Sequence, residues 1–188
     1  IHTPVLLDEV LHYLKPVKPQ SLLVDTTLGE GGYACAFLDA FPHIKLIGID
    51  IDSSILSCAK HRLVAYNERI RFFHMWFDEF FQHYSELVST YPDRIIFDLG
   101  ISRFHYEASG RGFSFAKDEP LDMRLSGDLP LTAYDIVNTY SEEELHTLFK
   151  QYGEERFARR IARTIVKKRK KTLIENALML SDIIAAVI

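Results

Sequence analysis

Leu22-Leu23-Val24-Asp25-Thr26-Thr27-Leu28-Gly29-Glu30-Gly31-Gly32-Tyr33 is a short apolar run that passes through an acid into a glycine-rich turn. An apolar helical pattern begins near Ala34. Glycine tolerates positive φ angles and lets a ligand approach the backbone, so such a turn can hold a ligand against the N-terminus of a helix. The pattern predicts a strand, a ligand-binding turn and a helix.

A second apolar run, residues 45–50, ends in Asp50, 21 residues after Gly29. In folds that bind nucleoside cofactors, a carboxylate at this distance holds the ribose hydroxyls. The turn and Asp50 together predict an adenosine-containing cofactor.

The length of the turn bears on which cofactor this is. Residues 29–34 fit the loose G-x-G-x-x-G/A pattern, but residues 25–28 separate the first glycine from the strand. In dinucleotide-binding proteins that glycine follows the strand almost at once. Asp25 would also repel a pyrophosphate and attract a cation. The turn resembles the first motif of class I methyltransferases, whose S-adenosylmethionine carries an ammonium group and no phosphate, and an NAD-dependent enzyme is the weakest alternative.

The first hundred residues alternate between short apolar runs and helical patterns. The expected strands are 22–25, 46–50, 71–74 and 94–99, and the expected helices are 33–40, 53–65 and 78–89. This alternation predicts an α/β fold with a doubly wound parallel sheet, in which ligands bind at the carboxyl ends of the strands. Gly29, Asp50, the residues after Phe73 and Asp98 all fall at that edge, where we expect the active site.

After Asp98 the alternation stops. Residues 100–130 form a long segment rich in glycine and charge, and loops of this length tend to be lids or binding loops. Thr132-x-x-Asp135 and Ser141-x-x-Glu144 read as capping boxes, and further helices are expected over 154–169 and 178–187. We expect three regions: a cofactor-binding domain over 1–105, a connecting active-site loop over 106–130 and an inserted helical substrate-recognition domain over 131–188.

The composition is that of an ordinary globular domain, with 47% apolar and 26% charged residues among 188. No apolar run approaches the ~20 residues of a membrane span and no signal-peptide pattern is present, so a cytoplasmic location is expected. Cys35 and Cys58 have no metal-ligand spacing and are expected to be small buried side chains in helices. No metal site is expected. The first residue is Ile1, not methionine, which suggests a piece of a longer chain.

The net charge of −4 hides an asymmetry. Residues 156–188 carry nine basic and two acidic side chains, and all nine basic residues lie between Arg156 and Lys171 with no acid among them. Such blocks commonly bind nucleic acid. The alternative is a solvated amphipathic helix that packs on the main domain without binding RNA. The candidate RNA contacts are Arg156, Arg159, Arg160, Arg163, Lys167 and Lys168, with Arg111 and Arg124 in the preceding loop.

Several stretches together resemble one family, the bacterial methyltransferases that modify the N4 amine of a cytosine in small-subunit (16S) ribosomal RNA. The resemblance covers essentially the whole chain, and the segments after Gly100 are the most specific. The matching stretches are residues 2–9, Asp25-x-Thr27-x-Gly29-x-Gly31-Gly32, Asp98-Leu99-Gly100-Ile101-Ser102, Arg111-Gly112-Phe113-Ser114-Phe115, Pro120-Leu121-Asp122-Met123-Arg124 and Tyr152-Gly153-Glu154-Glu155-Arg156-Phe157-Ala158.

The resemblance implies S-adenosylmethionine as the cofactor, with contacts from Gly31, Gly32, Tyr33, Asp50, Phe77, Asp98 and His105. The turn itself adds Asp25 and Gly29 to these candidates. Tyr33 stands where the family usually has histidine, and Arg103-Phe104-His105 stands where it usually has Ser-Pro-Gln. The family also continues beyond the length of this chain with the last strands of the sheet, so this chain alone could be inactive.

The implied reaction is an in-line attack of the cytosine amine on the sulfonium methyl group. The enzyme must mainly orient the two groups, which can contribute ~7–11 kcal/mol. Asp98 is the catalytic candidate, as an acceptor of a hydrogen bond from the amine. The target cytosine would have to be splayed out of the surrounding RNA, with Phe104 or Tyr106 as its stacking partners.

The expected partner is small-subunit ribosomal RNA or a ribosomal particle, and a homodimer is also open. Two rival functions remain. A methyltransferase acting on a small molecule or protein predicts no affinity for RNA. A noncatalytic RNA-binding or assembly protein with a vestigial pocket predicts RNA binding without methyl transfer.

Overall fold

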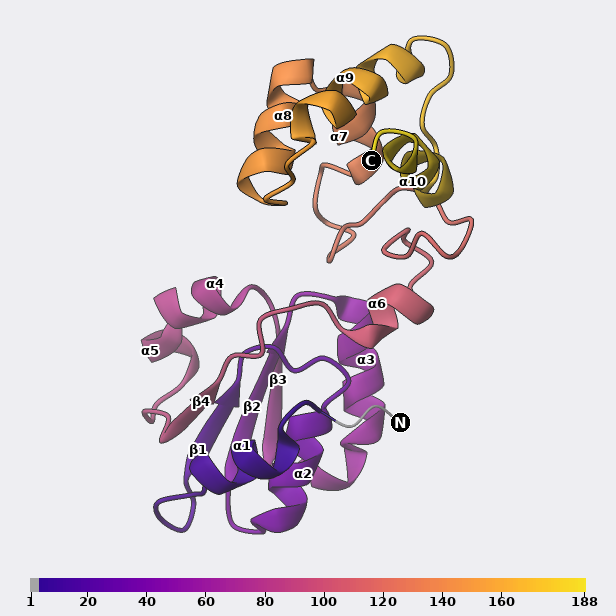
Figure 1. The fold of residues 1–188 in the computed structure, drawn as a ribbon. Coiled ribbons are helices and arrows are strands. Elements are labelled where there is room, and N and C mark those ends of the chain that lie inside the picture. The colour runs from indigo at the N-terminus through magenta and orange to yellow at the C-terminus, as the bar shows by residue number, and fades with distance from the viewer. Residues whose placement is uncertain (1–3) are drawn as a thin grey trace. The chain divides into compact units, whose positions relative to one another are not determined.

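The computed structural model describes residues 4–188, so His2 and Thr3 of the N-terminal motif lie outside the described residues. The chain forms two compact units, one up to Ser102 and the other from Arg103 onward (Figure 1). The predicted loop over 106–130 belongs to the second unit.

The first unit is built on a four-stranded parallel sheet. Its strands are β1 (Leu22–Asp25), β2 (Lys45–Asp50), β3 (Ile70–His74) and β4 (Arg94–Ile96), in the order β3-β2-β1-β4. Asp25 at the end of β1 is in register with Gly48 of β2 on one side and Ile96 of β4 on the other. The strand order reverses at β1, and the crevice beside such a switch point is where open α/β sheets bind ligands. The predicted doubly wound α/β fold is confirmed.

Helices cover both faces of this sheet (Figure 1). On one face Leu23 and Leu46 pack with α1 (Leu7–Tyr13), α2 (Gly32–Ala40) and α3 (Ser53–Arg62). On the other face Val24 and Ile47 pack with α4 (Phe77–Gln82) and α5 (Tyr84–Leu87). Alternate residues of each strand therefore enter opposite cores, which explains why the strands are apolar throughout.

The second unit begins with α6 (Arg103–Glu107) and an irregular segment, followed by four helices. These are α7 (Ala133–Thr139), α8 (Glu142–Gln151), α9 (Ala158–Arg169) and α10 (Ala177–Ala185). Thr132 and Ser141 both form the predicted capping boxes, with Asp135 and Glu144. The core of this unit joins Leu145 of α8 to Ile161 and Ile165 of α9. The predicted apolar stripe of that helix is therefore its buried face.

Some boundaries differ from the sequence prediction. The last strand ends at Ile96 and not at residue 99, because the next backbone N–H groups leave the ladder and Asp98 N–H donates to Thr27 Oγ1 at 2.8 Å. The helix expected over 53–65 ends at Arg62 and continues as a 3₁₀ turn over Val64–Tyr66. The helix expected over 78–89 is interrupted at His83.

The expectation of two buried cysteines was wrong. Cys58 of α3 is exposed, and Cys35 of α2 is half-buried and packs against the edge of the core. Nowhere in residues 4–188 is a helix long and apolar enough to cross a membrane.

Candidate functional site

The glycine turn is fixed to the sheet and to α3. Leu28 N–H donates to Ile49 O of β2 at 2.9 Å, and Gly31 N–H donates to Leu28 O at 2.9 Å. Gly31 has φ +76°, and a Cβ atom there would lie 2.8 Å from Leu63 Cδ1. Both the conformation and the close packing therefore require glycine at this position.

Helix α2 starts directly from this turn. Gly31 is its N-cap and provides no side-chain cap, so the first-turn N–H groups have no partner within the helix. Tyr33 is buried in that first turn, and its hydroxyl donates to Val5 O. Tyr33 therefore fixes the N-terminal segment, and a ligand at this helix end would meet backbone N–H groups.

Asp50, at the end of β2, is held in a single orientation by backbone donors. Its Oδ2 accepts from Gly29 N–H at 2.8 Å and its Oδ1 accepts from Asp52 N–H at 2.9 Å. These two bonds fix the direction in which the Asp50 carboxylate faces at this edge of the sheet.

Asp25, at the end of β1, is fully buried. Its Oδ1 accepts from Thr27 N–H at 3.2 Å, whereas its Oδ2 has no hydrogen-bond partner among the described residues. Burial raises the pKa of Asp25 to about 7; the Thr27 N–H opposes this shift, and the negative charges of Asp50 and Asp98 add to it. This edge of the sheet is therefore strongly unfavourable for further negative charge.

Asp98 comes two residues after β4 and is exposed. Its N–H donates to Thr27 Oγ1 at 2.8 Å, while Thr26 Oγ1 donates to Ile96 O at 2.7 Å. The two threonines thus join the turn after β1 to the segment after β4. Our sequence interpretation missed this role; the only signal was a pair of hydroxyl residues directly after the acid.

An aromatic group borders the same edge. Phe77 is the first residue of α4 and is half-buried, and its ring meets that of Phe97 edge-on, with centroids 5.5 Å apart at 84°. Phe97 is 49% exposed and follows β4 directly. Phe77 is therefore a partly accessible aromatic surface next to the carboxylates.

The structure places most of the predicted cofactor residues on the first unit. Those at or next to the carboxyl edge of its sheet are Asp25, Gly29, Gly31, Gly32, Tyr33, Asp50, Phe77 and Asp98. His105 belongs to the second unit, where it is buried in α6 with its ring 5.0 Å from that of Phe113. A cofactor contact from His105 stays a prediction.

The basic residues of α9 differ in their surroundings. Arg159 lies 3.4 Å from Glu143 and Arg163 lies 3.3 Å from Glu142, both in exposed pairs with α8. The guanidinium groups of Arg156 and Arg160 lie over the ring of Phe157, at 4.5 and 5.3 Å from its centroid. Exposed ion pairs of this kind are weak and screened by salt, so these four side chains remain available to a polyanion.

The end of α9 carries a denser positive charge. Lys167 and Lys168 are exposed, and neither has an ion-pair partner within residues 4–188. Arg169, by contrast, is half-buried and donates to Val137 O at 2.6 Å and to Tyr140 O, which satisfies carbonyls at the end of α7. The basic block therefore contains structural as well as solvent-facing members.

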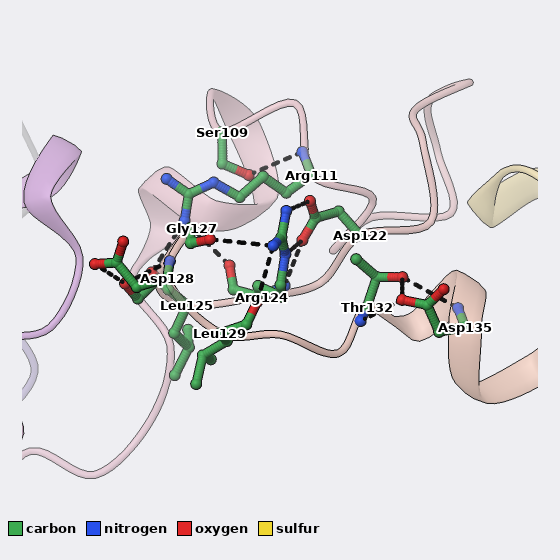
Figure 2. A network of polar contacts seen from close by, with 11 residues as sticks. Ser109, Arg111, Asp122, Arg124, Leu125, Gly127, Asp128, Leu129, Thr132 and Asp135 are labelled. Atoms are coloured by element: carbon green, nitrogen blue, oxygen red, sulfur yellow. Dashed lines mark hydrogen bonds and ion pairs between the residues drawn. The ribbon is translucent and has the colours of Figure 1, made fainter.

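Arg111 and Arg124 are engaged inside the irregular segment (Figure 2). Arg124 binds Asp122 through Nε and Nη2, both at 2.8 Å, and donates from Nη1 to the carbonyls of Gly127 and Leu129. Arg111 donates to the carbonyls of Arg124 and Leu125 at 3.1 and 3.0 Å. These contacts order the segment and occupy most of the donors of Arg124.

Among residues 4–188, no group of three or more His, Cys, Asp or Glu side chains could hold a metal ion.

Comparison with known proteins gives a consistent result. Residues 1–188 match the MraW methylase family. The chain is similar to a protein of Treponema denticola named Ribosomal RNA small subunit methyltransferase H, with 52% identity over 184 residues that cover 98% of this chain and 58% of that protein. A protein of the same name from Borrelia hermsii is 46% identical over 187 residues, covering 98% of this chain and 62% of that protein.

Among solved structures, a putative rRNA-methylase from Clostridium thermocellum is 21% identical, with a TM-score of 0.42 over 54% of each chain; this similarity is too low to bear on fold or function. The chain spans about three fifths of the length of the curated relatives it matches.

Proposed function

Because this chain belongs to the MraW methylase family, we propose that the whole protein is an S-adenosylmethionine-dependent methyltransferase acting on the N4 amine of a cytosine in small-subunit ribosomal RNA. The observation that carries the proposal is the buried acid Asp25 beside the glycine turn at the switch point of the sheet. The names of the relatives support ribosomal RNA as the substrate class.

The residues of the first unit fit this cofactor. Asp25 Oδ2 is a buried oxygen without a hydrogen-bond partner among the described residues, and the acids around it suit a cation and disfavour a pyrophosphate. When bound, S-adenosylmethionine supplies a methyl group on a positively charged sulfur. The carboxylates that favour its binding therefore match its charge.

Each of the other candidates has a role that its position supports. Asp50, held by two backbone N–H groups, would accept the ribose hydroxyls. Phe77 would pack against the adenine, since it offers an aromatic surface at the end of β3. The N–H groups at the start of α2 would meet the cofactor along the glycine turn.

Asp98 is our candidate for contact with the reacting amine. Its backbone is fixed by Thr27 while its carboxylate is exposed at the ligand edge. A carboxylate there can accept a hydrogen bond from the cytosine amine and hold the nitrogen lone pair toward the methyl group. Catalysis by orientation needs this precision more than it needs a strong base.

The basic side of α9 is our candidate RNA surface. Arg156, Arg159, Arg160, Arg163, Lys167 and Lys168 are all exposed along that helix or at its start. Contacts of this kind neutralise phosphates, so the affinity should fall steeply with salt. We place Arg111 and Arg124 outside this surface, because backbone carbonyls and Asp122 already engage their guanidinium groups.

The test is calorimetric titration of the protein with S-adenosylmethionine, with NAD as the control ligand, followed by methyl transfer to 16S RNA and to small ribosomal particles. We expect binding of S-adenosylmethionine alone, lost in Asp50→Ala, and transfer to one of the two RNA substrates. Binding without transfer to RNA would favour a different methyl acceptor. RNA binding without cofactor binding would favour a noncatalytic assembly protein.

A further inference from the structure

Asp25 is the fully buried acid of the site, and backbone donors neutralise its carboxylate less than they neutralise that of Asp50. Asp50 accepts two N–H groups, whereas Asp25 accepts one, from Thr27 at 3.2 Å. The remaining oxygen, Oδ2, is buried and has no hydrogen-bond partner among residues 4–188. A buried carboxylate in this state is costly unless a proton or a cation neutralises it.

Nearby hydroxyl groups do not supply the missing donor. Thr26 Oγ1 donates to Ile96 O at 2.7 Å, and Thr27 Oγ1 accepts from Asp98 N–H at 2.8 Å. Both hydroxyl groups are thus used in hydrogen bonds to β4 and to the segment that follows it. Among residues 4–188, Asp25 Oδ2 therefore has no hydrogen-bond partner at the end of this central strand.

Within residues 4–188, the charged groups that act on Asp25 from the elements packed around it are acidic. Asp50 faces it from β2 and Asp98 from the segment after β4, and both disfavour a negative charge on Asp25. Tyr33 of α2 is a buried phenol; burial raises its pKa, and the charges of Asp98 and Asp25 raise it further, so Tyr33 stays neutral near pH 7. The surroundings therefore favour the protonated acid when no ligand is present.

We propose that Asp25 couples cofactor binding to the release of a proton. In the ligand-free protein the Asp25 carboxyl holds a proton, and it releases that proton to solvent when a cationic group enters among Asp50 and Asp98. One O–H bond breaks, the proton leaves to buffer, and the carboxylate is then balanced by the ligand's positive charge. The inference rests on the proposed function, because the cation is the ammonium group of S-adenosylmethionine.

This coupling has two consequences. The site discriminates by charge, because an uncharged analogue does not stabilise the ionised form of Asp25. The affinity for the cofactor also falls with acidity, by about tenfold for each pH unit below the titration of Asp25 in the ligand-free protein. The pKa of Asp25, raised to about 7 chiefly by burial, places this dependence near neutral pH.

The experiment is calorimetric titration with S-adenosylmethionine at about pH 6, 7 and 8, in phosphate and in imidazole, which both buffer over this range and whose heats of ionisation differ. We expect buffer-dependent heats that report release of roughly half a proton per ligand at pH 7, more at the lower pH and little at the higher. Asp25→Asn should bind without this dependence. The matched control Asp78→Asn, an exposed acid in α4, should behave as the wild type.

A second measurement needs no substitution and covers the case in which Asp25→Asn does not fold. Carbon-13 NMR of the Asp25 carboxyl should show a titration near pH 7 without ligand and a lower midpoint with ligand. Binding with buffer-independent heats, or an ordinary aspartate titration, would overturn the coupling and leave the proposed function intact. No binding by the wild type at any pH would overturn the proposed cofactor and the coupling together.

Discussion

The backbone N–H of Asp98 donates to the side-chain oxygen of Thr27 at 2.8 Å, across 71 positions of sequence. This bond joins the residue that we assign to the reacting amine to the turn that we assign to the cofactor. The position of Asp98 relative to the turn therefore depends in part on the hydroxyl group of Thr27, which acts beside the Thr26 bonds to Ile96.

Thr27→Val removes that hydroxyl while keeping the branched shape of the side chain. The loss of one hydrogen bond is worth about 1 kcal/mol, so we expect cofactor binding to weaken roughly fivefold, with a larger loss of methyl transfer because Asp98 is less well placed. Calorimetry and a transfer assay measure the two effects. Thr27→Ser keeps the hydroxyl and serves as control; equal losses in both variants would contradict the role of the bond.

The stability of the ligand-free protein should depend on pH through Asp25. Its pKa is about 7 in the folded protein and 3.8 as an ordinary aspartate. Between these values the folded state binds a proton that the unfolded state has released, so the free energy of unfolding falls as pH rises from about 4 to 7, by at most about 4 kcal/mol. Urea unfolding across this range should show the decline, and Asp25→Asn should flatten it. An unchanged slope in that variant would assign the decline to other groups.

The irregular segment of the second unit offers a matched pair of glycine substitutions. Gly110 and Gly112 have φ +67° and +75°, but a Cβ on Gly112 would lie 2.3 Å from Pro120 O, whereas one on Gly110 meets nothing within 4 Å. Gly110→Ala should cost about 1–2 kcal/mol from the left-handed conformation alone. Gly112→Ala should cost clearly more. Hydrogen exchange of Met123 N–H, which donates to Arg111 O, reports on this segment; similar effects would contradict the packing argument.

Arg124→Lys tests whether Arg124 is a structural residue. Lysine cannot reproduce two bonds to Asp122 together with bonds to the carbonyls of Gly127 and Leu129. We expect local destabilisation of roughly 1–3 kcal/mol, seen as faster exchange of Arg124 neighbours. The salt dependence of RNA binding should not change, since lysine keeps the charge and no phosphate contact is lost. If the variant were as stable as the wild type but bound RNA more weakly, Arg124 would be an RNA contact and not a structural residue.

The double variant Lys167→Ala/Lys168→Ala tests the RNA surface. Each phosphate contact contributes about 0.7 to the slope of log affinity against log salt for a single strand, so this slope should decrease by up to about 1.4. Filter binding to 16S RNA fragments over a salt series measures it. Lys45→Ala, at the amino end of β2 and thus at the opposite edge of the sheet, is the control. Equal slopes in all three proteins would remove α9 from the RNA surface.

Sequence patterns were sufficient for the parts of the fold that local chemistry determines. The first strand was predicted to the residue, the next two to within one residue, and both capping boxes are present. The shortened end of β4 was missed because Thr27, far away in sequence, takes the N–H of Asp98. Local periodicity contains no information about such a long-range bond.

The site was predictable as a set of residues at one edge, but not as an electrostatic arrangement. The acid Asp25 is evident in the sequence, yet its complete burial and its unsatisfied oxygen arise only when β2 and β4 flank β1. Arg111 and Arg124 show the opposite problem. Their charge suggested RNA contacts, and only the folded segment reveals the carbonyls and the carboxylate that they bind.

Strand β4 lies at the end of the sheet order and pairs only with β1 among the described residues. Its outer edge is a row of backbone donors and acceptors, next to Ile95 and Phe97, which are 37% and 49% exposed. Such an edge is a template for strand addition, and two copies of this chain can pair through it without any evolved dimer interface. Self-association of the chain should therefore be followed over a dilution series, beside Ile95→Lys, before any dimer is assigned to its function.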